Sequence, residues 1–89
     1  MPTVEFTRNL ARHVACPTEA VAGDTVGAAL DDYFARHPAV RPYVLDDQGR
    51  VRHHVTVFVD GQQLRDRGSL GERVGDATLV SVMQALSGG

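Results

Sequence analysis

The chain has 89 residues, of which 43% are hydrophobic and 22% are charged. This composition is typical of one folded domain and unlike that of a disordered or fibrous chain. Nine arginines stand against eleven acidic residues, giving a formal net charge of −2, which argues against nucleic acid as the main partner. No apolar run approaches the roughly 18 residues of a membrane span, and no signal-peptide pattern is present. We therefore expect a cytoplasmic protein with no membrane partner.

The first half of the chain predicts a strand hairpin followed by a helix. Apolar and polar residues alternate from Thr3 to Asn9, which indicates a half-buried strand. A second strand is expected within residues 12–21, at a sheet edge because Pro17 cannot donate to a ladder. Gly23-Asp24-Thr25 provides a turn and a side-chain cap for a helix over residues 25–36. The apolar stripe of this helix consists of Val26, Ala29, Leu30, Tyr33 and Phe34.

The second half predicts two further strands. Residues 39–45 allow one extra helical turn, and residues 51–60 form the strongest strand pattern, with valines at 55, 57 and 59 on one face. Residues 62–76 indicate a loop with a short turn of helix, and residues 78–84 a last strand. This order predicts an α+β β-grasp fold, in which one main helix packs across one face of a mixed four- to five-stranded sheet. The domain would span residues 1–84, and residues 85–89 would form a flexible tail.

The candidates for side-chain catalysis or metal binding are weak. Of the four histidines, His53 and His54 are neighbours on the predicted strand and would point to opposite faces, so they cannot chelate one ion together. The single cysteine, Cys16, can form no internal disulfide and has no identifiable activating base nearby in sequence. Asp46 and Asp47 are explained by an Asp-Asp-Gln-Gly turn. The other two histidines are His13 and His37. From these patterns we expect no metal site and no catalytic side chain.

Several short motifs occur in an informative order. They are Gly-Asp-Thr-Val (23–26) before the helix, Val-Phe-Val-Asp-Gly (57–61) ending the long strand, Gly-Asp (75–76) before the last strand, and Gly88-Gly89. Together with the element order over nearly all of the chain, they resemble the ubiquitin-like sulfur carriers. This family includes the small subunit of molybdopterin synthase and the carriers of thiamin and cysteine biosynthesis. The long connection over residues 37–52 is more similar to the molybdopterin and cysteine carriers than to the shorter thiamin carrier.

The resemblance implies a function for the tail. In this family the terminal carboxylate, here that of Gly89, is adenylated with ATP by a partner enzyme that resembles ubiquitin-activating enzymes. Sulfur then displaces AMP and leaves a thiocarboxylate for a sulfur-accepting biosynthetic enzyme. The chain would be a carrier without a bound cofactor, and its partner would perform the catalysis. The tail residues that the partner would recognise are Gly88, Ser87, Leu86 and Ala85, where many relatives carry proline and small apolar residues before the glycines.

A partner-binding surface is expected on the sheet face opposite the helix. If the valines of the last two strands point inward, alternation turns the residues between them outward. Phe58 and Met83 would then form an exposed apolar spot of the kind found at interfaces. The alternative is two scattered surface hydrophobic residues, which are common on any protein. The residues expected on this partner face are Phe58, Met83, Thr56 and Ser81.

Two other functions fit the same sequence. One is a ubiquitin-like modifier that Gly89 joins to a target lysine through an isopeptide bond. The other is a non-covalent β-grasp binding module with an inert tail. The sequence does not name the sulfur acceptor, and molybdopterin precursor, thiamin thiazole, cysteine, a transfer RNA base and a specialised metabolite all stay open.

Overall fold

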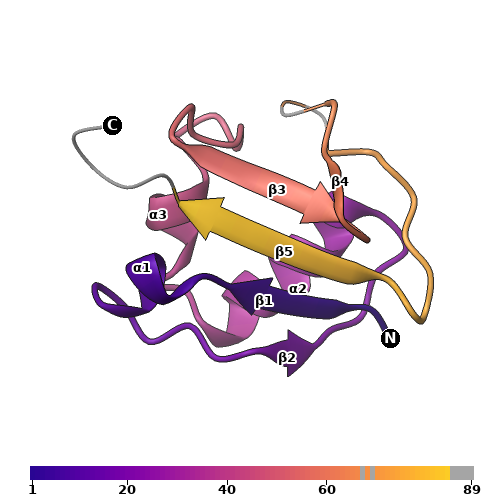
Figure 1. Ribbon diagram of the computed structural model, residues 1–89, viewed down its shortest axis with the longest axis horizontal. Coiled ribbons are helices and arrows are strands. Elements are labelled where there is room, and N and C mark those ends of the chain that lie inside the picture. Colours follow the sequence, from indigo (N-terminus) through magenta and orange to yellow (C-terminus); the bar gives the residue numbers. More distant parts are fainter. Residues whose placement is uncertain (67, 69, 85–89) are drawn as a thin grey trace.

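The computed structural model describes residues 1–66, 68 and 70–84. Its centre is a mixed five-stranded sheet in the order β2-β1-β5-β3-β4 (Figure 1). The central strand β5 runs parallel to its neighbour β1 and pairs antiparallel with β3 on its other side. The strands are β1 (Thr3–Phe6), β2 (Glu19–Ala20), β3 (Val55–Val59), β4 (Gln62–Gln63) and β5 (Leu79–Gln84).

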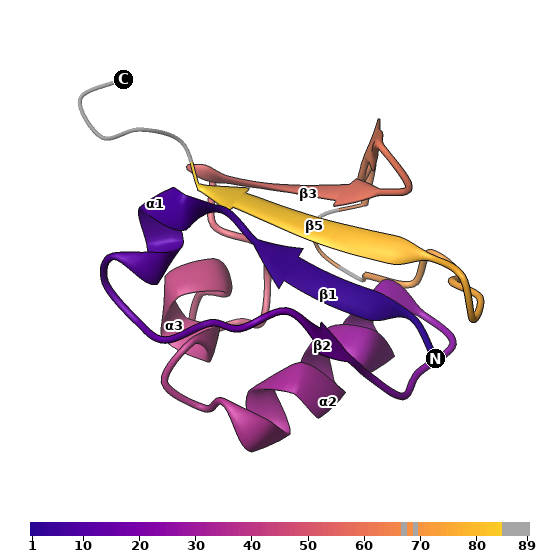
Figure 2. The same cartoon turned by 60° about the horizontal axis from the view of Figure 1, so that its bottom comes forward.

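The helices leave one face of the sheet uncovered. The long helix α2 (Val26–Arg36) lies across the other face, and the short α3 (Arg41–Val44) follows it on the same side (Figure 2). The short helix α1 (Arg8–Ala11) lies at the end of the sheet where β5 ends (Figure 1). The core fills the space between sheet and α2, and fully buried members contributed by both layers include Val4, Val57, Val80, Val82, Leu30 and Tyr33.

The structure confirms the predicted β-grasp architecture and the main helix. Thr25 caps α2, since its side chain accepts a hydrogen bond from the backbone of Ala28. Three local predictions were wrong. The first strand ends at Phe6 instead of Asn9, because the chain turns into α1. The long strand begins only at Val55, after a turn closed by its backbone N–H and the Arg52 carbonyl. Within the described part of residues 62–76 there is no helix, and the chain forms β4 instead.

Gly23 shows why a glycine precedes the main helix. Its φ of 143° lies in a region that L side chains rarely adopt. A Cβ at this position would lie 2.6 Å from the backbone nitrogen of Ala29, closer than real Cβ contacts allow. The turn therefore packs directly against the first turns of α2, and only glycine permits this approach.

Gly23→Ala is expected to destabilise the fold by about 2–3 kcal/mol through strain and backbone displacement. Urea unfolding followed by circular dichroism would measure the loss. Gly75→Ala is the matched control, because a Cβ there meets nothing closer than Thr78 Oγ1 at 4.0 Å. Equal unfolding midpoints for the two variants would contradict this explanation.

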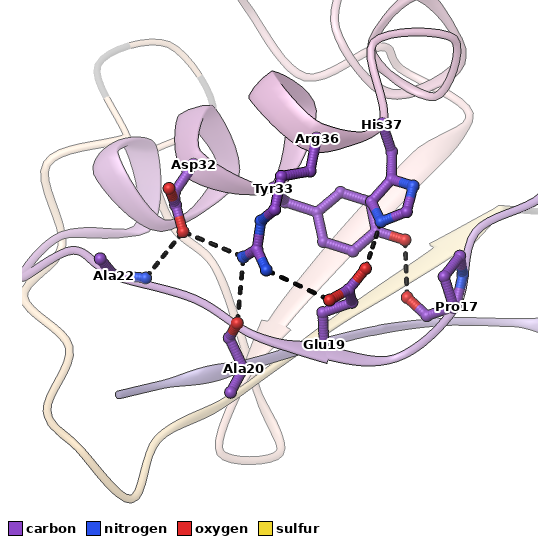
Figure 3. Close-up of polar contacts among 8 residues, drawn as sticks. All are labelled: Pro17, Glu19, Ala20, Ala22, Asp32, Tyr33, Arg36 and His37. Atoms are coloured by element: carbon purple, nitrogen blue, oxygen red, sulfur yellow. Dashed lines mark hydrogen bonds and ion pairs between the residues drawn. The ribbon is translucent and has the colours of Figure 1, made fainter.

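Edge strand β2 is held to α2 by a polar cluster (Figure 3). The Arg36 guanidinium donates to Glu19 at 3.2 Å, to the Ala20 carbonyl at 3.0 Å and to Asp32 at 3.0 Å. Glu19 also contacts the His37 ring. Asp32 in turn accepts a hydrogen bond from the backbone of Ala22 at 2.9 Å. These contacts attach a two-residue strand that backbone pairing alone would hold weakly.

Tyr33 extends this attachment into the core. Its side chain is fully buried, and its hydroxyl donates to the Pro17 carbonyl at 2.6 Å. The ring lies against Phe6 and His37, with centroids 4.9 and 4.7 Å away. Burial is the main cause that raises the pKa of Tyr33 to about 12. The hydroxyl thus stays protonated in the folded protein.

This pKa shift predicts a loss of stability at alkaline pH. In the unfolded chain Tyr33 ionises near its ordinary pKa of 10, whereas in the folded chain it ionises at about 12. The stabilising contribution is therefore present below pH 10 and is lost as the pH rises towards 12. Tyr33→Phe should lower the free energy of unfolding by about 1 kcal/mol at neutral pH and remove this alkaline component. Urea unfolding across pH would test this, and parallel pH profiles for both proteins would contradict it.

Candidate functional site

The site is built around the end of β5, the central strand from which the tail continues. β5 lies between β1 and β3 (Figure 1), with Val82 paired to Phe6 and Gln84 paired to Val55. The predictions for Ala85, Leu86, Ser87, Gly88 and Gly89 fall outside the described residues. The structure therefore describes the base of the tail and the surface around it.

The four residues of the expected partner face lie on neighbouring strands. Thr56 pairs with Met83, and Phe58 pairs with Ser81. Their burial alternates with that of the inward valines, since Met83 is 44% exposed and the other three are half-buried. Figure 2 shows that α2 and α3 lie on the opposite side of the sheet. The structure thus places all four on one uncovered surface, the outer sheet face.

Leu79 is a member of this face that sequence reasoning missed. It lies two residues before Ser81 on β5 and is 36% exposed. Alternation along the last strand could have identified it, because Leu79, Ser81 and Met83 are two residues apart and therefore point to the same face of the sheet. The outer sheet face therefore carries apolar side chains at Leu79, Phe58 and Met83.

A polar pair divides this apolar surface. The Ser81 hydroxyl donates to the Glu5 carboxylate at 2.8 Å, across the pairing of β1 with β5. The two side chains thus form a hydrogen bond to each other near the centre of the sheet. The arrangement provides apolar contact area beside one fixed acidic group, which suits recognition of a partner surface more than chemistry.

The expectation for His53 and His54 was wrong in its geometry. The two residues lie in the turn before β3, and their ring centroids are 5.5 Å apart instead of on opposite faces of a strand. Among the residues that the structure describes, no three His, Cys, Asp or Glu side chains are grouped to hold a metal ion. Two neighbouring rings alone do not make a stable zinc site.

Cys16 and the acidic turn offer no catalytic arrangement. Burial raises the pKa of the half-buried Cys16 thiol, which disfavours the reactive thiolate. The pKa of Asp46 is lowered, chiefly because its carboxylate accepts a hydrogen bond from the backbone of Arg50. A shallow hollow of about 330 Å³ beside this turn is lined by Asp46, Asp47, Gln48 and Arg52, none of which is a nucleophile paired with a base. The turn is explained by its own hydrogen bonds.

Within the described residues, no helix has the length and apolar character needed to cross a membrane. The fold and site together define a small β-grasp domain in which one sheet face carries no described helix and the final strand is followed in sequence by residues 85–89, which end in two glycines.

Comparison with known proteins identifies the family. No family model matches the chain. Small archaeal modifier protein 1 of Haloferax volcanii is 34% identical over 70 residues, 78% of this chain and 76% of that relative. Its crystal structure has a TM-score of 0.79 at 28% identity, covering 99% of this chain and 98% of the other. Sulfur carrier protein CysO of Mycobacterium tuberculosis is 26% identical over 72 residues, 79% of this chain and 77% of the relative.

A further structural neighbour supports the fold. The crystal structure of the Amycolatopsis orientalis BexX/CysO complex matches with a TM-score of 0.83 and 23% identity, over 100% of both chains. The chain belongs to the ubiquitin-like sulfur-carrier family. Its relatives are named as a sulfur carrier and a protein modifier, and they share the β-grasp fold.

Proposed function

We propose that the protein is a sulfur carrier that a partner enzyme activates at the Gly89 carboxylate. The observation that carries this proposal is family membership combined with Gly88-Gly89 placed five residues or fewer beyond the last described strand residue, Gln84. The pathway that receives the sulfur is a biosynthetic one. The relatives named as a sulfur carrier and a protein modifier support assigning the catalysis to the partner enzyme.

The chemistry requires activation because a carboxylate is a poor electrophile. A Gly89 oxygen attacks the α-phosphorus of ATP, which releases pyrophosphate and gives an acyl adenylate. Hydrosulfide then attacks the carbonyl carbon, AMP leaves with the bonding electron pair, and one proton is released. The product is a terminal thiocarboxylate, in which sulfur is held for transfer to an acceptor. The carrier provides the carboxyl group, and the adenylating enzyme orients and polarises it.

Glycine at both final positions suits this reaction. An enzyme cleft that encloses the terminal carboxylate must admit the backbone closely, and glycine removes the Cβ and widens the accessible φ range. The same terminus has to reach an activating enzyme and then a sulfur-accepting one, so an extended tail on a rigid domain is favoured. The preceding residues Ala85, Leu86 and Ser87 would set which enzymes accept the tail.

The outer sheet face is the proposed docking surface for the adenylating partner, which would be similar to ubiquitin-activating enzymes. Support comes from the exposed Met83 and Leu79 and the half-buried Phe58 on adjoining strands. Apolar side chains in this arrangement are typical of interface centres. A CysO relative of the same fold was crystallised in complex with BexX, which fits a carrier of this shape binding another protein.

A second function is favoured by one observation, the 34% identity to small archaeal modifier protein 1. In that case the activated Gly89 would be attacked by a lysine amine of another protein, and AMP would leave as an isopeptide bond forms. The chain itself has no lysine among its 89 residues. It therefore could not build lysine-linked chains of itself, and each modified target lysine would carry a single copy.

Pyrophosphate exchange tests activation without requiring the acceptor. The full chain is incubated with an adenylating enzyme from the same organism, ATP, Mg²⁺ and labelled pyrophosphate, and label entering ATP is measured. Exchange that depends on the carrier supports the proposal, because only reversible adenylate formation returns pyrophosphate to ATP. Absence of carrier-dependent exchange with all such enzymes of the organism would contradict it.

A further inference from the structure

The two strands beside β5 bring basic residues to the base of the tail. On one side, the Thr7 N–H donates to the Val82 carbonyl at 3.1 Å, so α1 begins directly beside the end of β5. On the other side, Val55 of β3 pairs with Gln84, the last described residue of β5. The turn over residues 52–54 immediately precedes Val55, so it lies beside the end of β5. Figure 1 shows α1 and the start of β3 on either side of the end of β5. We call the basic side chains of these segments the basic rim, which comprises Arg8, Arg12, His13, Arg52, His53 and His54.

The segments that form the rim are basic, and on the β3 side the Asp46 and Asp47 carboxylates lie beside Arg52. Residues 7–13 and 50–56 contain four arginines and three histidines and no acidic residue. Arg8, Arg12, His13 and His53 are exposed. Among the described residues, neither Arg8 nor Arg12 forms an ion pair, whereas Arg36 forms two. Within the described residues, the positive charge on the α1 side of the rim is therefore not compensated by an ion pair.

Three exposed carboxylates lie at the opposite end of the sheet. Asp60 follows β3 there, Asp76 precedes β5 and Asp24 precedes α2, and all three are exposed. These carboxylates are partly compensated, because the amino group of Met1 lies 3.1 Å from Asp76 and Arg73 forms a β-bridge with Thr25 beside Asp24.

The rim is also held in place by the fold. The His13 ring stacks on Tyr43 of α3 with centroids 6.4 Å apart, and the Arg52 Nε donates to the Pro42 carbonyl of the same helix at 2.7 Å. The two sides of the rim are thereby joined through α3. A surface fixed in this way loses little side-chain freedom on binding.

The length of residues 85–89 limits the distance between the basic rim and an enzyme that binds the Gly89 carboxylate. Five residues reach at most about 17 Å from Gln84 when fully extended. An enzyme that encloses the Gly89 carboxylate therefore brings the mouth of its cleft to the base of the tail. The tail side chains, Ala85, Leu86 and Ser87, carry no charge that could complement the rim.

We propose that the basic rim docks an acidic protein surface at the mouth of the adenylating enzyme's cleft. This inference rests on the proposed function and adds a second contact, separate from the apolar outer sheet face. The rim accelerates encounter and orients the tail before it enters the cleft, so it acts on the association step. A protein is favoured over nucleic acid as the occupant because the Glu5 carboxylate and the Asp46 and Asp47 carboxylates beside Arg52 would repel an extended phosphate backbone.

Charge reversal at Arg8 tests the rim. Arg8 is the first residue of α1, where an acidic side chain suits the helix dipole, so Arg8→Glu should fold normally. Initial rates of adenylation by the enzyme from the same organism are measured against carrier concentration at low and physiological ionic strength. We expect about a tenfold rise in KM at low salt with kcat unchanged, and a weaker salt dependence than in the natural chain. Arg12→Glu should behave in the same way.

Arg73→Glu is the matched control, because it makes the same charge change beside Asp24, far from the tail base. Equal KM values for the Arg8 and Arg73 variants, or a salt-independent KM for the natural chain, would contradict the docking role of the basic rim. Either result would leave the proposed carrier function intact. No adenylation of the natural chain would instead overturn the proposed function and the rim with it. Inhibition by a short single-stranded RNA that Arg8→Glu relieves would assign the rim to phosphate and also overturn the proposal.

Discussion

Deletion of Gly89 is expected to abolish adenylation while leaving the unfolding midpoint unchanged. The reaction needs an α-carboxylate on a residue without a side chain, and the deleted chain would present Gly88 one residue too short to reach the nucleotide. A misplacement of this size removes the geometry on which the transfer depends, so we expect a rate loss of at least about 10³-fold. Carrier-dependent pyrophosphate exchange measures the loss.

The stability of the variant separates fold from function. The core lies within residues 1–84, between the sheet and α2, so the last residue is expected to contribute little to the free energy of unfolding. Addition of one alanine after Gly89 is the complementary variant, because it lengthens the tail by one residue and moves the free carboxyl group off Gly89. Activity in either variant at the natural rate would contradict the proposed attachment point.

Phe58→Asp should raise the KM for activation by about 30-fold, corresponding to about 2 kcal/mol of lost contact at an apolar interface centre. Phe58 is half-buried on the outer sheet face, so the aspartate removes apolar contact area and introduces a charge beside the partner. We expect the free energy of unfolding to fall by only about 1 kcal/mol, because the ring is not part of the buried core. Adenylation kinetics and urea unfolding measured together would show both effects.

Met83→Asp provides a second variant with even less risk to the fold, since its side chain is 44% exposed. Thr18→Asp is the matched control, because Thr18 is exposed beside β2 at the other side of the molecule from β3. If both face variants keep the KM of the control, the outer sheet face is not the docking surface.

Local patterns in the sequence predicted the parts of the fold that depend on neighbouring residues. The spacing of Val26, Leu30 and Tyr33 predicted α2, and alternating valines predicted which face of β3 is buried. The error at His53 and His54 arose because the start of β3 is set by a backbone hydrogen bond between Arg52 and Val55, for which alternation gives no signal.

Contacts between distant residues could not be predicted. Glu19 and His37 meet across 18 positions only because β2 pairs with β1 while α2 crosses the same sheet. The basic rim is similar, because strand order and not sequence spacing brings Arg8 and His53 to the end of β5. Residues 85–89 were singled out by sequence and resemblance alone, and their part in the site stays a prediction.

Sulfur loading at Gly89 is the central claim, and intact mass spectrometry tests it most directly. The full chain is incubated with the adenylating enzyme of the same organism, Mg²⁺-ATP and sulfide, and a parallel sample omits ATP. The account predicts an ATP-dependent gain equal to the mass difference between sulfur and oxygen, located by fragmentation to the C-terminal glycine and absent from the chain lacking Gly89. An unchanged mass despite carrier-dependent pyrophosphate exchange, or the same gain in the chain without Gly89, would contradict it.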